Sequence, residues 1–315
     1  MAVQLGIVIP AYKAKYLDAA LMSIAAQTNK SFKVYVCDDG SKEDIKSIAN
    51  KYTDQLDIQY HRFDENLGGR SLVQHWNRSI ALANEEWLWL FSDDDVLAPG
   101  CVQAFFDALQ ITQSQHNLYR FNIEMIDAND EVICVKEPHP TTETGYEFLK
   151  RRLQSKSLSA VVEYVFKKEV FDASNGFDDF PLAYCADDAT WLKFAGNLLI
   201  FTIQSQKIYW RASGINISSS GGFQTQKMEA LLKFVKHILN KYPENKTELL
   251  QLAEPWFYEN LGYIHGRLSF WEAMKLSFKL NALFKGSKPG AMKKIIASQL
   301  RNTRFADKVQ KWSGY

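Results

Sequence analysis

Three consecutive aspartates, Asp93, Asp94 and Asp95, follow an apolar run of strand length at residues 87–91. Adjacent carboxylates repel one another unless a positive group lies among them. A hard divalent cation such as Mg²⁺ or Mn²⁺ is a natural partner, and it could bridge to the phosphates of a bound nucleotide. A solvated acidic loop that caps the next helix would explain the same residues. The triplet alone leaves both interpretations open.

A second acidic pair, Asp187-Asp188, lies shortly before Trp191. A carboxylate can act as a general base by taking the proton of a hydroxyl group whose oxygen attacks a substrate. Neighbouring acidic groups would raise the pKa of such a carboxyl group and help it act near neutral pH. Taken by itself, however, the pair is better explained as a helix N-terminal cap, where aspartate is stabilising.

The elements that must position these groups alternate along the first 115 residues. We expect strands over residues 3–9, 32–37, 57–62 and 86–91, separated by segments with helical spacing of apolar residues. This alternation predicts an α/β fold with a doubly wound parallel sheet and helices on both faces. Ligands of such sheets bind beyond the carboxyl ends of the strands. The polar clusters lie at those ends: Pro10-Ala11-Tyr12, Asp38-Asp39-Gly40 and the acidic triplet.

The rest of the chain is less regular. Residues 117–215 read as mixed strands and helices, with strands over 198–203 and 207–211. The polar stretch 218–222 is our candidate domain boundary, and it could also close over a bound ligand. We expect a catalytic domain over residues 1–220 and a helical C-terminal extension over 221–315. Within the catalytic domain, residues 1–110 form the nucleotide-binding half and residues 111–220 the acceptor-side half.

The opening third of the chain resembles the large family of inverting glycosyltransferases with the A-type (GT-A) fold, the family 2-like enzymes that use nucleotide-sugars. The resemblance is strong over residues 3–110, weaker to about 220 and absent beyond. It implies a mostly parallel mixed sheet flanked by helices, and sugar transfer to a glycan or lipid-linked acceptor in bacterial surface polysaccharide synthesis. The motifs that carry it are Val8-Ile9-Pro10-Ala11-Tyr12, Ser23-Ile24 with Gln27-Thr28, Val36-Cys37-Asp38-Asp39-Gly40-Ser41, Glu65-Asn66-Leu67-Gly68-Gly69, and Trp89 to Asp95 with Pro99.

The resemblance implies a nucleotide site at the first strand ends. Pro10, Ala11 and Tyr12 would line the base pocket, with Tyr12 against the base. Asp39 would hydrogen-bond the base or the ribose, and Arg70 would reach the base or a phosphate. UDP is the default nucleotide for this pattern, although these residues do not exclude GDP or dTDP.

The resemblance also implies a metal ligand and a base. Asp94 takes the position of the ligand to Mn²⁺ or Mg²⁺, with Asp93 toward the ribose and Asp95 at the flank. Asp188 takes the position of the catalytic base. Ser213 stands where relatives often carry a metal-binding His, which leaves water or Asn216 as substitutes.

Composition narrows the function further. A formal net charge of +1 gives no electrostatic case for nucleic acid. The four cysteines are scattered, which fits a reducing cytoplasm rather than a zinc or disulfide site. Residues 286–315 carry seven Lys or Arg against Asp307. This basic region could be a solvated helix face, a partner contact, or a peripheral contact with the inner face of the cell membrane.

Two other classes remain as alternatives, and a third is excluded by a missing motif. A catalytically inactive GT-A-fold protein that binds carbohydrate or nucleotide would keep the fold, but the presence of both acidic sites argues against it. A sugar nucleotidyltransferase would need a glycine-rich phosphate loop after the first strand, and residues 10–13 have no glycine. A dinucleotide-binding dehydrogenase would need a GxGxxG motif at the same place.

Overall fold

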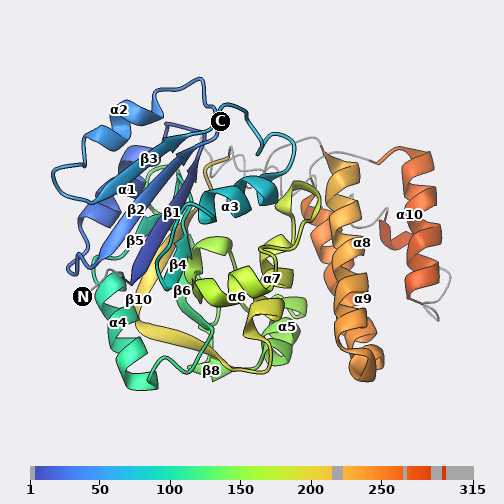
Figure 1. Ribbon diagram of the computed structural model, residues 1–315. Coiled ribbons are helices and arrows are strands. Elements are labelled where there is room, and N and C mark those ends of the chain that lie inside the picture. Colours follow the sequence, from blue (N-terminus) through green and yellow to red (C-terminus); the bar gives the residue numbers. More distant parts are fainter. Residues whose placement is uncertain (1–3, 215–222, 265–267, 285–292, 296–315) are drawn as a thin grey trace. The chain divides into compact units, whose positions relative to one another are not determined.

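The computed structural model describes residues 4–214, 223–264, 268–284 and 293–295. The chain forms two compact units, an α/β unit of residues 1–152 and 156–211 and a helical unit of residues 153–155 and 212–315 (Figure 1). The proposed loop at 218–222, Asn216 and most of the basic region at 286–315 lie outside the described residues. Our functional division at residue 220 stays a prediction.

Four parallel strands form the N-terminal half of the sheet, in the order β3-β2-β1-β4. β1 lies between β2 and β4, and its apolar run is buried on both faces. Alternate residues therefore face opposite helix layers: Ile7 and Ile9 belong to the core that also holds residues of the helices after β1, β2 and β5. The strands are β1 (Leu5–Ala11), β2 (Phe32–Asp38), β3 (Ile58–Arg62) and β4 (Trp87–Leu90).

The second half of the sheet is mixed. β9 (Tyr164–Lys167) lies antiparallel between β4 and β6 (Leu118–Ile126). β10 (Ile200–Arg211) runs parallel to β6 and returns to pair with β5 (Val96–Leu97), which follows the acidic triplet. The two strands predicted over 198–203 and 207–211 are wrong as separate elements, because one strand continues through an irregularity between Ile203 and Lys207. β7 (Val132–Cys134) and β8 (Thr142–Glu143) add short edge pairings.

Helices cover the sheet, and α3 lies to the right of the parallel strands in Figure 1. α3 starts later than the glycines suggest, because Ser71 caps it by accepting a hydrogen bond from the backbone N–H of Gln74. Gly68 and Gly69 therefore belong to the preceding loop. The helices of this unit are α1 (Leu17–Ala25), α2 (Ile45–Asn50), α3 (Leu72–Ile80), α4 (Cys101–Thr112), α5 (Gly145–Leu153), α6 (Lys168–Ala173) and α7 (Ala186–Ala195).

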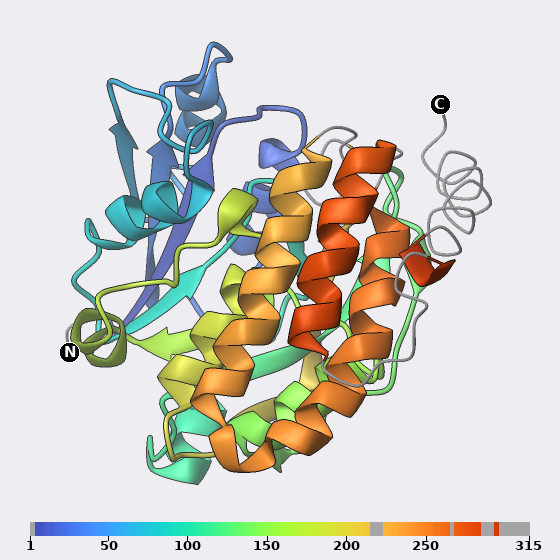
Figure 2. The same ribbon diagram turned by 90° about the vertical axis from the view of Figure 1, so that its right-hand side faces the viewer.

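The described residues of the helical unit include α8 (Gln224–Lys241), α9 (Lys246–Tyr263) and α10 (Phe270–Leu283). α8 and α9 lie side by side in both views (Figures 1 and 2). Phe234 of α8 packs against Trp256 of α9 with ring centroids 5.4 Å apart. None of the described helices is long and apolar enough to cross a membrane.

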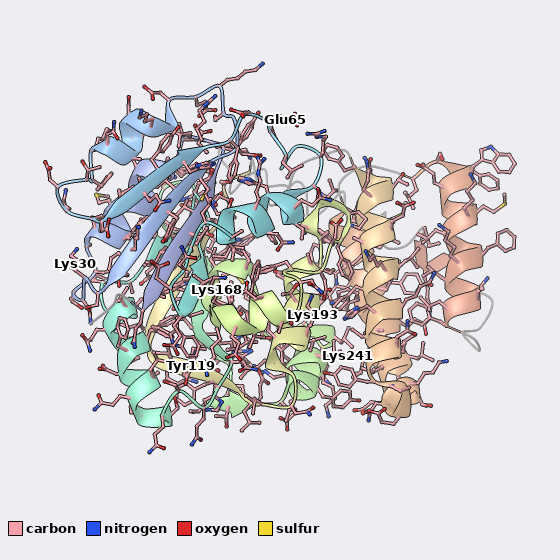
Figure 3. All side chains as sticks on the ribbon, in the orientation of Figure 1. Lys30, Glu65, Tyr119, Lys168, Lys193 and Lys241 are labelled. Carbon is pink, nitrogen blue, oxygen red and sulfur yellow. The ribbon has the colours of Figure 1, made fainter. Side chains whose placement is uncertain are left out.

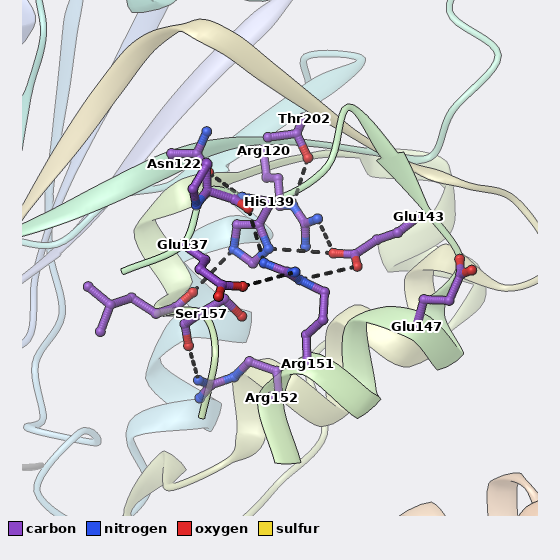
Figure 4. Close-up of polar contacts among 12 residues, drawn as sticks. Arg120, Asn122, Glu137, His139, Glu143, Glu147, Arg151, Arg152, Ser157 and Thr202 are labelled. Carbon is purple, nitrogen blue, oxygen red and sulfur yellow. Dashed lines mark hydrogen bonds and ion pairs between the residues drawn. The ribbon is translucent and has the colours of Figure 1, made fainter. Parts of the chain in front are cut away.

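A buried polar network joins the strands of the second half of the sheet (Figure 4). The Arg120 guanidinium of β6 donates to Glu143 of β8, and its Nε donates to Thr202 of β10 at 3.1 Å. Nearby, the fully buried carboxyl group of Glu163 has no hydrogen-bond partner among the described residues. Burial raises the pKa of Glu163 to about 8, although the charge of Arg120 opposes this shift. Glu163 is therefore largely neutral in the folded protein at pH 7.

The raised pKa makes Glu163 a source of pH-dependent instability. In the unfolded chain Glu163 ionises above its ordinary pKa, whereas in the folded protein it stays protonated until about pH 8. The contribution of Glu163 to stability is therefore present at low pH and is lost as the pH rises toward 8. We expect Glu163→Gln to match the wild type near pH 4 and to exceed it by on the order of 2–3 kcal/mol at pH 7. Denaturant unfolding at several pH values measures this difference. The matched control is Glu169→Gln at an exposed position of α6, and parallel pH profiles for wild type and Glu163→Gln would contradict the assignment.

Candidate active site

The acidic triplet is fixed to the end of β1 by one of its own side chains. A carboxylate oxygen of Asp93 accepts hydrogen bonds from the backbone N–H groups of Tyr12 at 2.9 Å and Lys13 at 3.0 Å. Tyr12 and Lys13 follow the last residue of β1, where hydrogen bonding to neighbouring strands has ended. The Asp93 carboxylate accepts the hydrogen bonds that their backbone N–H groups would otherwise lack. Burial raises the pKa of Asp93, while the two hydrogen bonds oppose that shift. Asp93 therefore joins the loops that follow β4 and β1.

The other side of the triplet is fixed by the last residue of β10. Asp95 is buried and accepts a hydrogen bond from the backbone N–H of Arg211 at 2.7 Å. The Arg211 side chain is also buried, and its Nε donates to the main-chain carbonyl of Asp94 at 2.8 Å. Burial, with the charge of Asp94 next to it, raises the pKa of Asp95 well above its usual range. This position gives Arg211 a clear structural role in shaping the loop.

Asp94 lies half-buried between these two anchored neighbours. No group of three or more His, Cys, Asp or Glu side chains within the described parts of the chain is arranged to hold a metal ion. Mg²⁺ sites commonly use only one or two protein carboxylates and take further oxygens from substrate phosphates and water. The Oδ2 atom of Asp95 is buried without a hydrogen-bond partner among the described residues. The carboxylate of Asp94 is the oxygen donor of this loop that fits a cation whose coordination a bound nucleotide would complete.

Asp39, at the end of β2, organises the loop before α3. Its two carboxylate oxygens accept from the backbone N–H groups of Leu67 at 2.9 Å and Gly68 at 2.8 Å. The Arg78 guanidinium also donates to it, and the Asp39 side chain is almost fully buried. A Cβ at Gly68 would lie only 2.7 Å from Asp39 Oδ2, so the close approach requires glycine. The predicted contact between Asp39 and a base or ribose remains a prediction beside this structural role.

The remaining predicted nucleotide-site residues differ in exposure. Tyr12 is 40% exposed, so part of its ring is available to a ligand, whereas Ala11 is fully buried and can only shape the chain. Pro10 is half-buried within β1. Arg70 is exposed and pairs with Glu65, which Figure 3 labels on the loop between β3 and α3. Hydrogen bonds connect the first two strand ends, because Asp39 N–H donates to the Ala11 carbonyl at 2.9 Å.

The second acidic pair lies at the start of α7, in a separate group of contacts. Asp188 is buried, and both of its oxygens accept hydrogen bonds from Arg152, with Nε–Oδ1 at 2.9 Å and a second guanidinium nitrogen 3.0 Å from Oδ2. Arg152 is itself held by the Ser157 carbonyl at 3.0 Å, a contact visible in Figure 4. Asp187 is more exposed than Asp188. Burial, followed by the charge of Asp188, raises the pKa of Asp187 to about 7.

The backbone before this pair is strained. Leu182, Ala183 and Cys185 adopt left-handed φ values of 59°, 56° and 67°. Such conformations are costly for residues with a Cβ and persist where the surroundings impose them. They place Asp187 and Asp188 in the first turn of α7.

The sequence did not reveal two arginine side chains that hold Asp39 and Asp188. Arg78 and His75 are three residues apart in α3 and therefore lie on the same face of that helix. Helical spacing could thus have placed Arg78 near the loop that precedes α3. Arg152 ends a basic run at residues 150–152, but nothing in the sequence pairs it with Asp188. Both are long-range contacts that the fold creates.

Comparison with known proteins shows which family this chain resembles. Residues 6–154 match the family model described as glycosyl transferase family 2. The chain is 22% identical over 254 residues to an uncharacterized glycosyltransferase of Nostoc, covering 76% of this chain and 74% of that protein. Over residues 6–154 the chain is similar to the family 2 glycosyltransferases. This result confirms the predicted family.

Solved structures confirm the fold of this glycosyltransferase. Staphylococcus aureus TarS residues 1–349, solved with UDP-GlcNAc, superposes with a TM-score of 0.67 at 16% identity, covering 97% of this chain and 92% of that chain. The mannosyltransferase PcManGT of Pyrobaculum calidifontis, solved with GDP-Man and Mn²⁺, gives a TM-score of 0.53 at 18% identity, covering 95% and 87%. The GT-A fold class predicted from the sequence is correct.

The structural role of Asp39 predicts a stability effect in the absence of any ligand. Asp39→Asn removes the charge that pairs with Arg78 and forces an amide N–H₂ toward backbone donors. We expect it to lower the stability of the ligand-free enzyme by about 2–4 kcal/mol, measured by denaturant unfolding. Asp54→Asn, at an exposed position after α2, is the control. Unchanged ligand-free stability would mean that Asp39 serves only the nucleotide.

Proposed function

We propose that the enzyme moves a sugar from a nucleoside-diphosphate donor to a hydroxyl group of a glycan or lipid-linked saccharide, with inversion at the anomeric carbon. One observation carries this proposal: a family 2-like glycosyltransferase holds the acidic loop at Asp94 against the end of β1 and a second carboxylate pair at the start of α7. Direct displacement needs two separate groups. One stabilises the diphosphate leaving group, and the other acts as a base on the acceptor hydroxyl. Bacterial surface polysaccharide synthesis is the process we propose for it.

The donor site we propose lies at the ends of β1, β2 and β4. The exposed part of the Tyr12 ring would stack on the base, and Asp39 would keep the Leu67–Arg70 loop in place around the nucleotide. Solved structural neighbours contain UDP-GlcNAc in one case and GDP-Man in another. UDP remains our proposed nucleotide, with GDP and dTDP as the alternatives to be tested beside it.

The cation we propose is Mn²⁺ or Mg²⁺, with Asp94 as the protein ligand. Its support is the oxygen donor set of the acidic loop and the Mn²⁺ present in the structure of PcManGT. When bound, such a cation supplies positive charge that stabilises a diphosphate leaving group. Asp93 and Arg211 act on the protein side by fixing the backbone on both sides of Asp94.

Asp188 is our proposed catalytic base. As the acceptor oxygen bonds to the anomeric carbon and the bond to the diphosphate breaks, the acceptor proton passes to the carboxylate. Arg152 positions Asp188 through two hydrogen bonds and would hold its orientation as the charge changes. Asp187, with a pKa near 7 and greater exposure, is the second candidate, and its charge acts directly on Asp188.

Donor and metal binding can be tested without an acceptor. We expect thermal shifts with one class of UDP-, GDP- or dTDP-sugar that increase when Mn²⁺ is added. Asp94→Asn should remove the Mn²⁺-dependent part of the shift, because it removes the proposed ligand charge. Asp54→Asn should leave the shift unchanged. The absence of a shift with every donor, with and without metal, would refute a nucleotide-sugar site.

Transfer assays separate the two candidate bases. A base acts in its deprotonated form, so transfer by Asp187, whose pKa is raised to about 7, would give a rate that rises with pH through 7 and then levels. We expect Asp188→Asn to reduce kcat by about 10²–10⁴-fold while the donor-induced thermal shift remains. Asp187→Asn should retain more activity, because Asp188 still takes the acceptor proton. The reverse pattern would assign the base to Asp187.

A further inference from the structure

Helix α10 exposes aromatic side chains that a solvated helix would not. Phe270, Trp271 and Phe278 are 67%, 66% and 68% exposed. The helix buries the opposite face, with Ala273, Leu276 and Leu280 packed inward. Both faces therefore carry apolar groups, and only the inner one has a partner among the described residues.

The exposed aromatic groups lie near one another on the outer side of α10. Trp271 and Phe278 are seven residues apart, which places them on the same side of an α-helix about 10 Å from each other. Phe270 lies beside Trp271, with ring centroids 5.6 Å apart. The Ser269 capping box fixes the start of the helix, so the first two aromatic residues lie in a defined first turn. We call Phe270, Trp271 and Phe278 the α10 aromatic face.

Positive charge accompanies this face. Lys275 and Lys279 are exposed and lie on the side of α10 next to Trp271 and Phe278. The single acidic residue of the helix, Glu272, accepts hydrogen bonds from the backbone and side chain of Ser269 in the capping box. The sequence after α10, from residue 285 to 315, holds eight Lys or Arg and one acidic residue, Asp307. Any surface that covers the aromatic face therefore meets the positive charges of Lys275 and Lys279.

This charge selects among the possible occupants. A second copy related by two-fold symmetry would bring the same lysines together, and protein interfaces are generally depleted in lysine. An anionic lipid surface instead attracts the lysines while Trp and Phe enter the boundary between headgroups and acyl chains. At 14 residues, α10 is long enough to lie on a bilayer but shorter than the ~20 residues needed to span one.

We propose that the α10 aromatic face docks this protein on an anionic membrane surface. Phe270, Trp271 and Phe278 enter the interface, and Lys275 and Lys279 contact the headgroups. The proposal is independent of the sugar-transfer reaction and goes beyond it. Docking by one helix face is reversible and weakens with salt, because part of the attraction is between exposed charges.

Vesicle co-sedimentation of the full chain tests the proposal without any donor or acceptor. We expect binding to phosphatidylcholine vesicles that contain phosphatidylglycerol and much weaker binding to phosphatidylcholine alone. Trp271→Ser with Phe278→Ser should reduce the affinity at least about tenfold. Lys275→Gln with Lys279→Gln should reduce it about tenfold or more for anionic vesicles. Ile111→Ser, at a 77% exposed position of α4, is the matched control and should bind like the wild type.

Thermal unfolding of each variant checks that the fold is retained, as expected for side chains two-thirds exposed. Absence of binding to anionic vesicles would overturn the proposal. Equal binding of wild type and the aromatic double variant would also overturn it, since the charge elsewhere would then carry the attraction. A concentration-dependent dimer that Trp271→Ser with Phe278→Ser abolishes, without vesicle binding, would assign the face to a second copy.

Discussion

The carboxylate of Asp93 is the contact on which the site depends. It accepts hydrogen bonds from the backbone N–H groups of Tyr12 and Lys13, which lie where β1 and its pairing with neighbouring strands end. Charge-assisted hydrogen bonds of this kind contribute roughly 1.5–3 kcal/mol each. These bonds join the loop after β4 to the loop after β1. The acidic triplet is therefore held in a fixed position relative to Tyr12 and Lys13. The Asp39–Ala11 hydrogen bond extends the same connection to β2.

The three aspartates are tolerated side by side because each meets a different environment. Asp93 satisfies backbone donors, and Asp95 is buried against the β10 backbone with a raised pKa. Arg211 brings a guanidinium to the Asp94 carbonyl. The repulsion inherent in three adjacent carboxylates is therefore reduced by the hydrogen bonds that Asp93 and Asp95 accept from the backbone. The residue between the two anchored ones keeps a half-buried carboxylate at the sheet edge.

The sequence allowed the fold class and the strand ends to be predicted, because apolar runs and the motifs after them depend on local spacing. It did not reveal which side chains meet across the fold. Asp39 was assigned to the nucleotide alone, although Leu67, Gly68 and Arg78 engage it in the structure. The Arg152–Asp188 pair has no local signature for the same reason. The continuous β10 strand was read as two, since the irregularity after Ile203 interrupts the pattern that marks a strand.

The return of β10 to the acidic loop has a consequence for folding kinetics. The Asp95–Arg211 hydrogen bond joins residues 116 positions apart, and the Asp93–Tyr12 bond spans 81. Contacts of such long sequence separation require closure of large loops and form slowly compared with local ones. The donor end of the sheet therefore cannot be complete until nearly the whole α/β unit has been synthesised and paired. A chain interrupted before Arg211 would contain every residue of the acidic triplet while lacking the strand that fixes its geometry.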